Sequence, residues 1–97
     1  MDSVSFHRLA ENELRDAAEF YENERPGLGV SFLGAVERSI AAILTNPEAG
    51  APVLGSVRRR LVQRFPYGVL YRVRPEGVRI LAVMNLRRRP YYWVGRL

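Results

Sequence analysis

Hydrophobic residues near the start of the chain alternate with polar ones and then change to a helical spacing. Val4–Phe6 follows the two-residue period that is typical of a short, half-buried strand. From Ala10 apolar residues recur every three or four positions until Pro26, and a second stripe of this kind runs through Phe32 to Pro47. The short Pro-Gly-Leu-Gly turn between the stripes predicts an antiparallel helical hairpin.

Strand patterns fill the second half of the chain. Residues 47–56 are rich in proline and glycine, and we expect a loop there. Strands are predicted over Arg58–Phe65, Val69–Arg74 and Val78–Met84, with a tight hairpin at Pro75–Gly77. The order of elements therefore predicts an α+β fold: an N-terminal strand, then a helical hairpin packed on a mainly antiparallel sheet with a C-terminal three-strand meander. Arginines on the other face or edge of the sheet should stay solvated.

Length and composition limit the chemistry. The 97 residues fit a single domain over 1–97. The sequence has no cysteine and one histidine, His7, so we expect neither a metal nor a cofactor. His7 itself is expected at the start of the first helix or on the surface. The uninterrupted apolar runs are a few residues long and no signal-peptide pattern opens the chain, which predicts a cytoplasmic protein without a membrane partner.

Charge is divided unequally between the two halves. Residues 1–49 carry 4 arginines and 9 acidic residues, a balance of −5, whereas residues 50–97 carry 11 arginines against Glu76 alone, a balance of +10. A half as basic as this one attracts anionic partners, and arginine offers planar, bidentate contacts to phosphate and carboxylate groups. The arginines of 58–60 and Arg64 are interpreted either as a contact surface or as solvation of a sheet edge.

A succession of short motifs resembles the RelE/ParE family of type II toxin-antitoxin toxins, which includes plasmid stabilisation proteins. The residues that carry this resemblance are Ala10, Glu13-Leu14, Tyr21, Phe32, Pro47, Arg59, Phe65-Pro66-Tyr67, Tyr71, Ala82-Val83, Arg88, Pro90, Tyr92-Trp93 and Arg96. The resemblance implies a small growth-inhibiting toxin held inactive by a cognate antitoxin, whose acidic or amphipathic disordered tail wraps the toxin. Operator DNA would be bound only indirectly, through the antitoxin.

The resemblance leaves two targets open. RelE-like members cut mRNA in the ribosome without a metal and carry two adjacent basic residues after the last strand, followed by a tyrosine. ParE-like members inhibit DNA gyrase and lack that set. Here Asn85 and Leu86 follow the last strand, so a ParE-like gyrase inhibitor that acts by binding is the first expectation. An mRNA endonuclease is the alternative, and a non-catalytic RNA-binding module is the third.

Candidate site residues follow from these readings. For binding to the target or the antitoxin they are Arg58, Arg60, Arg64, Arg87, Arg88, Arg89 and Arg96. For the nuclease alternative they are Arg87, Arg88, Tyr91 and Tyr92. Cleavage of RNA needs a proton acceptor, and arginine stays protonated, so a binding inhibitor is expected in preference to an enzyme. The only tryptophan, Trp93, is expected to close the core beneath the helices.

Overall fold

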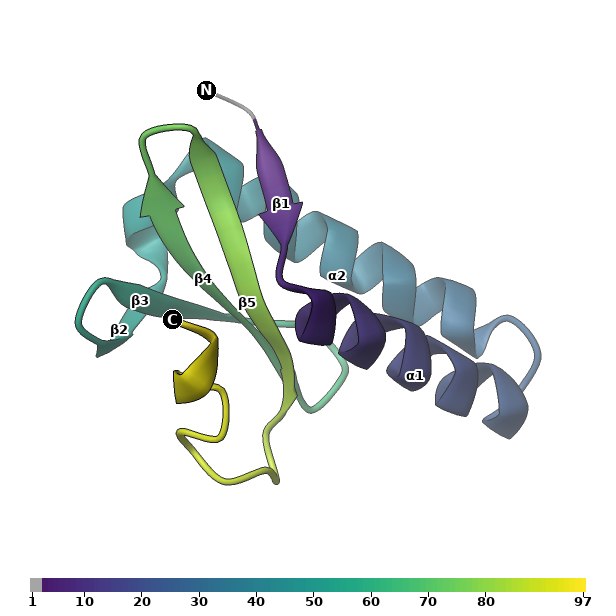
Figure 1. Ribbon diagram of the computed structural model, residues 1–97. Helices are drawn as coiled ribbons and strands as arrows, with labels where there is room; N and C mark the ends of the chain where they lie inside the picture. Colours follow the sequence, from purple (N-terminus) through teal and green to yellow (C-terminus); the bar gives the residue numbers. More distant parts are fainter. Residues whose placement is uncertain (1–2) are drawn as a thin grey trace.

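A computed structural model describes residues 3–97 as two helices packed on a five-stranded sheet (Figure 1). The elements are β1 (Val4–Phe6), α1 (Arg8–Glu24), α2 (Leu28–Thr45), η1 (Pro47–Ala49), β2 (Ala51–Leu54), β3 (Val57–Leu61), β4 (Tyr67–Arg74), β5 (Gly77–Asn85) and η2 (Val94–Arg96). The strand order is β1-β5-β4-β3-β2; β1 runs parallel to β5, and every other pair is antiparallel. The predicted α+β architecture is therefore confirmed.

Side chains at the ends of the helices define the hairpin. His7 caps α1, because its Nδ1 accepts the backbone N–H of Leu9 at 3.0 Å. The carboxylate of Glu22 accepts the N–H groups of Gly27 and Gly29, both at 2.9 Å, and these bonds lower the pKa of Glu22. An added Cβ at Gly29 would lie 2.5 Å from a carbonyl oxygen of α1, so glycine permits the close contact between the helices.

The larger core lies between the helices and the sheet. Its fully buried large side chains include Phe32, Val36, Ile43, Val69, Tyr71, Ile80 and Val83. The hydroxyl of Tyr71 donates to the Pro47 carbonyl at 2.6 Å and accepts the Gly50 N–H at 3.2 Å. These two bonds attach η1 to the sheet.

A smaller core covers the opposite face of the sheet. It contains Val57, Leu70, Leu81, Ala82, Met84 and Trp93. A bulge creates part of this surface: Leu70 pairs with Ala82 and Tyr71 with Ile80, so Leu81 is an extra residue in β5. The C-terminal segment places Trp93 on this face, where it is completely buried. The expected position of Trp93 beneath the helices is wrong, and this face is not simply a solvated arginine surface.

The segment expected to be a loop contributes a strand. Residues 47–56 contain η1 and β2, and β2 pairs with β3 through a turn in which Gly55 adopts a φ of 55°. Pro52 is tolerated because β2 is the edge strand of the sheet. The meander consequently has four strands, and β3 ends at Leu61 rather than at Phe65.

Helix α2 is long and apolar enough to cross a membrane, judged by length and composition alone. The sequence-based expectation considered only uninterrupted apolar runs and did not predict such a helix, because Glu37 and Arg38 interrupt the apolar residues of α2. In the fold, Phe32, Val36 and Ile43 of α2 are buried in the larger core. Packing inside the protein thus accounts for part of the apolar composition of this helix, whereas Val30 and Leu33 are exposed.

Candidate functional site

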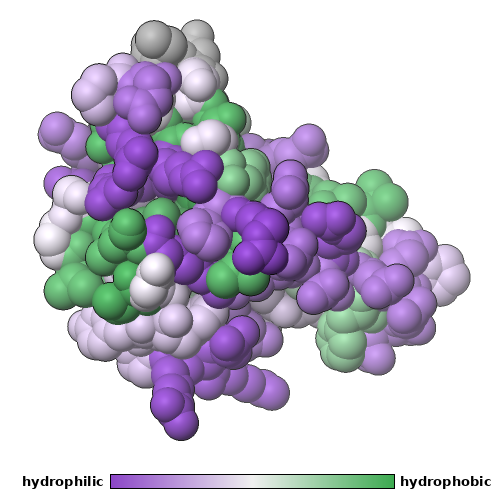
Figure 2. Space-filling view, in the orientation of Figure 1, coloured by the Kyte–Doolittle hydropathy of each residue, from purple (hydrophilic) through white to green (hydrophobic). Residues whose placement is uncertain are grey.

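A groove of about 360 Å³ opens on the sheet face opposite the helices, between β3 and the C-terminal segment. It is lined by Val53, Arg59, Leu61, Leu70, Met84, Leu86, Arg88, Pro90 and Tyr91. Leu70 and Met84 are buried, whereas Leu61, Leu86 and Tyr91 remain 55%, 42% and 55% exposed. Hydrophobic side chains are visible among hydrophilic ones on this side of the molecule (Figure 2). Exposed leucines and a tyrosine beside a hollow suit a docking surface for an apolar anchor.

Two arginines supply the charge of the groove. The stem of Arg59 lies across Gly68, where an added Cβ would be 3.1 Å from its Cγ and Cδ. The Nε of Arg59 is buried and has no hydrogen-bond partner among residues 3–97. The Arg88 guanidinium lies 3.9 Å from the ring centroid of Tyr92, a cation-π contact. No carboxylate or imidazole lines the groove, and in the described part of the chain no three His, Asp or Glu side chains could hold a metal ion.

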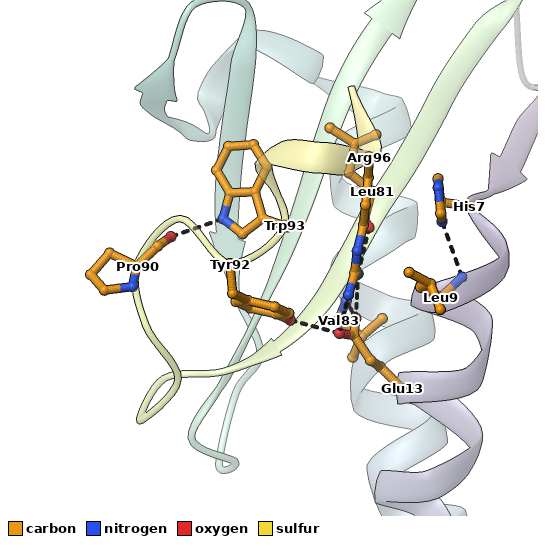
Figure 3. Close-up of polar contacts among 9 residues, drawn as sticks. All are labelled: His7, Leu9, Glu13, Leu81, Val83, Pro90, Tyr92, Trp93 and Arg96. Atoms are coloured by element: carbon orange, nitrogen blue, oxygen red, sulfur yellow. Dashed lines mark hydrogen bonds and ion pairs between the residues drawn. The ribbon is translucent and has the colours of Figure 1, made fainter.

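A network centred on Glu13 holds the C-terminal segment beside the groove (Figure 3). Arg96 donates to both carboxylate oxygens of Glu13, at 2.9 and 2.8 Å, and Tyr92 donates its hydroxyl at 2.8 Å. In β5 the Val83 N–H donates to Glu13 at 3.0 Å, and the Leu81 carbonyl accepts from Arg96 at 2.9 Å. The ion pair therefore provides hydrogen-bond partners for the Val83 N–H and the Leu81 carbonyl, which lie beyond the part of β5 that pairs with β1.

This network assigns structural roles to residues considered for chemistry. Burial raises the pKa of Tyr92, and its hydrogen bond to Glu13 raises it further. Tyr92 consequently keeps its proton near neutral pH and acts as a donor to Glu13. The bond to Glu13 also raises the pKa of Arg96. Trp93 completes the anchor because it is buried in the smaller core, and its indole N–H donates to the Pro90 carbonyl of the same segment at 2.9 Å.

The arginines expected to bind a partner do not form one patch. Arg58 donates to the carbonyls of Glu48 and Gly50, at 2.9 and 2.8 Å, and thereby holds η1. Arg60 lines a separate hollow beside α2. Arg96 is bonded to Glu13, as described above. None of these three arginines lines the groove, and Arg58 and Arg96 bond within the molecule. Of the seven expected binding residues, Arg88 is the one found in the lining.

The other four lie together at one end of the sheet, and we call them the basic end: Arg64, Arg87, Arg88 and Arg89. All are exposed. They occupy the β3–β4 turn and the loop after β5, which are joined by a hydrogen bond of 2.9 Å from the Leu86 N–H to the Pro66 carbonyl. Of the residues considered for a nuclease, Arg88 and Tyr91 reach the groove, whereas Arg87 and Tyr92 are absent from its lining.

Two residues at this surface were not among the expected site residues, although Arg59 belongs to the arginine run of 58–60 interpreted as a contact surface or a solvated edge. Arg59 shares a sheet face with Val57 and Leu61, as simple strand alternation from Val57 indicates. Glu13 lies on the same stripe of α1 as the buried Ala10 and Ala17, at spacings of three and four. An acidic residue on a buried stripe needs a partner, which was the available signal in the sequence.

Comparison with known proteins agrees with this geometry. The family model described as "ParE toxin of type II toxin-antitoxin system, parDE" matches residues 4–90. A solved structure described as "Chromosomal ParDE TA system from P. aeruginosa" superposes with a TM-score of 0.75 at 20% identity, covering 88% of this chain and 96% of that chain. A search of curated proteins found no match. With most of its length matched by the family model, the chain belongs to the ParE family of type II toxin-antitoxin toxins.

Proposed function

We propose that this toxin inhibits DNA gyrase by binding it, and that a cognate antitoxin neutralises the toxin in the cytoplasm. The observation that supports binding over cleavage is the composition of the groove, whose lining holds two arginines and no carboxylate or imidazole. Metal-free RNA cleavage needs a group that accepts the proton of the 2′-hydroxyl. Guanidinium groups stabilise anions but remain protonated, so this surface is suited to holding a partner.

The groove is also the surface that we assign to the antitoxin. Its exposed apolar rim, formed by Leu61, Leu86 and Tyr91, can receive Leu or Val anchors. Arg59 and Arg88 lie where acidic side chains of the same segment would pair with them. A tail that folds on binding offsets its ordering cost through a large contact area, and an amphipathic acidic tail matches this mixture of apolar and basic groups.

A ribosome-dependent mRNA endonuclease is the second candidate. The observation that favours it is the presence of Arg59, Arg88 and Tyr91 around one groove. In this alternative the arginines would stabilise the phosphorane, and the hydroxyl of Tyr91 would be the group available for proton transfer. Tyr92 is unsuited to that role, because its hydroxyl is committed to Glu13.

The experiment that separates the two is pulse labelling of DNA and protein after induction of the toxin, with transcript ends mapped in parallel. We expect DNA synthesis to stop first and Tyr91→Phe to keep its potency, because the ring that lines the groove is retained. Tyr92 must stay intact in this test, since its removal would disturb the Glu13 network. Immediate loss of protein labelling, with cut transcripts that disappear in Tyr91→Phe, would establish the nuclease instead.

A further inference from the structure

Arg64 has a backbone conformation that arginine rarely adopts. It lies in the β3–β4 turn with a φ of 74°, the one non-glycine residue at positive φ among residues 3–97. Glycine or asparagine adopts this conformation at lower cost. Side chains held in unfavourable backbone regions concentrate at functional positions. The conformation therefore singles out Arg64 as a candidate functional residue, and its side chain is exposed.

The rest of the basic end is also ordered and available. Asn85 accepts the Arg87 N–H on its side chain at 2.9 Å and the Arg88 N–H on its carbonyl at 3.0 Å. Asn85 thereby shapes the loop that carries three consecutive arginines. In the described part of the chain, no carboxylate lies within 4.0 Å of the guanidinium groups of the basic end. Hydrophilic side chains project from this lower end of the molecule (Figure 2), where Figure 1 places the loop after β5.

A surface such as the basic end is suited to bind a polyanion through its charge. Recognition of unpaired bases needs exposed aromatic rings on which the bases stack. Phe65, the aromatic neighbour of Arg64, instead packs against Tyr21 and Phe32, with ring centroids 4.9 and 5.1 Å apart. The exposed ring in these two segments is Tyr91, which lines the groove that we assign to the antitoxin. The four arginines can therefore contact phosphate groups, but they are not interleaved with a row of rings on which successive bases could stack. The arrangement suits the backbone of a duplex rather than a single strand.

We propose that the basic end binds the phosphate backbone of duplex DNA, without sequence preference and without help from an antitoxin. The choice of DNA over duplex RNA rests on the proposed gyrase target, because the toxin would then act where DNA is already held. In that complex the basic end would contact DNA and leave the groove to a protein partner, with Arg88 at the border that the two surfaces share.

Fluorescence anisotropy of a labelled duplex with the purified toxin tests this directly. We expect binding at low salt that weakens as salt rises, with a slope of about −3 to −4 in log K against log salt for a duplex of about 20 base pairs. Arg64→Gly/Arg87→Ala/Arg89→Ala should lower the affinity at least tenfold and reduce the magnitude of that slope. The variant spares Arg88, which contacts Tyr92. Arg15→Ala/Arg25→Ala/Arg38→Ala removes the same number of exposed charges from the helical hairpin and should retain the affinity.

Arg64→Gly and Arg64→Lys distinguish the effect of the Arg64 charge on DNA binding from any effect of the substitution on folding. Glycine relieves the left-handed backbone, so Arg64→Gly should not lower the thermal midpoint although it weakens DNA binding. Arg64→Lys keeps the charge and should retain most of the affinity. Absence of binding at low salt, equal losses in the two triple variants, or tighter binding to duplex RNA would overturn the proposal. Gyrase is absent from the assay, so its result is independent of whether the toxin inhibits that enzyme.

Discussion

His7 links the start of α1 to the charge around it. Burial lowers the pKa of its imidazole, and the positive charges of Arg96, Arg79 and Arg8 lower it further. The neutral ring accepts the Leu9 N–H, and the folded state therefore favours the neutral form. In the unfolded chain the ring takes up its proton near the ordinary value of 6.5. The contribution of His7 to stability is thus complete above that pH and is lost as pH falls toward the lower pKa of the folded state.

Replacement His7→Asn tests this contribution. Asparagine caps helices well and does not titrate. We expect the free energy of unfolding to match the parent protein at about pH 8, and the variant to lose less stability than the parent between about pH 8 and about pH 5.5. Urea denaturation at the two pH values measures the difference. An identical pH dependence in both proteins would show that His7 does not contribute.

At the scale of elements, local patterns predicted the helices better than the sheet. The apolar stripes and prolines mark α1 and α2, because the period and the breakers act within a few residues. Strand β2 has four residues, including Pro52, and depends on β3 for its pairing. The bulge at Leu81 changes which face the side chains of β5 occupy, and only the register with β4 reveals it. Trp93 covers a strand surface distant in sequence, a contact that no local pattern encodes.

The attachment of the C-terminal segment depends on Glu13. Glu13→Ala removes the acceptor of four hydrogen bonds and leaves Arg96 with its side chain only 10% exposed. We expect a loss of about 2–4 kcal/mol in the free energy of unfolding, because breaking a largely buried pair strands the remaining charge. Trp93 is the only tryptophan, so its fluorescence reports docking of the segment during urea denaturation.

Glu11→Ala is the matched control on the same helix. The side chain of Glu11 is 63% exposed and faces Arg15 at 4.0 Å. Its replacement should change stability by no more than about 0.5 kcal/mol. A double-mutant cycle of Glu13→Ala with Arg96→Ala should give a coupling energy of about 1–3 kcal/mol. Equal losses in the free energy of unfolding for the Glu11 and Glu13 substitutions would contradict the proposal that Glu13 attaches the C-terminal segment.

Strand β3 provides the groove with an exposed rim residue that tests antitoxin binding. Leu61→Glu places a negative charge where we expect acidic and apolar side chains of the antitoxin. We expect the affinity of this variant for the cognate antitoxin to fall at least tenfold, about 1.4 kcal/mol, as measured by calorimetry. Val30→Glu on α2 is the control, because Val30 is 70% exposed and distant from the groove lining. A loss of affinity confined to Val30→Glu would show that the antitoxin binds the helices instead of the groove.

At the scale of the whole molecule, charge follows architecture. The half with a balance of −5 supplies the helical hairpin, and the half with +10 supplies four strands and the C-terminal segment. This division could be predicted from the sequence. Which arginines are free could not be predicted, because Arg58 and Arg96 bond to groups elsewhere in the chain, whereas Arg64 and Arg89 make no such bond among residues 3–97. A count of charges identifies a basic surface, but only the fold separates the residues that hold the structure from those that can meet a partner.

A supercoiling assay with purified components is the most direct test of the proposal that this toxin inhibits gyrase by binding it. Relaxed plasmid, gyrase and ATP are incubated with increasing toxin, with and without the antitoxin, and the topoisomers are resolved on a gel. We predict that supercoiling falls as toxin is added, that Tyr91→Phe acts like the parent, and that the antitoxin restores supercoiling. Undiminished supercoiling at toxin concentrations in excess of gyrase, with codon-positioned cleavage of mRNA when ribosomes are supplied instead, would contradict the claim.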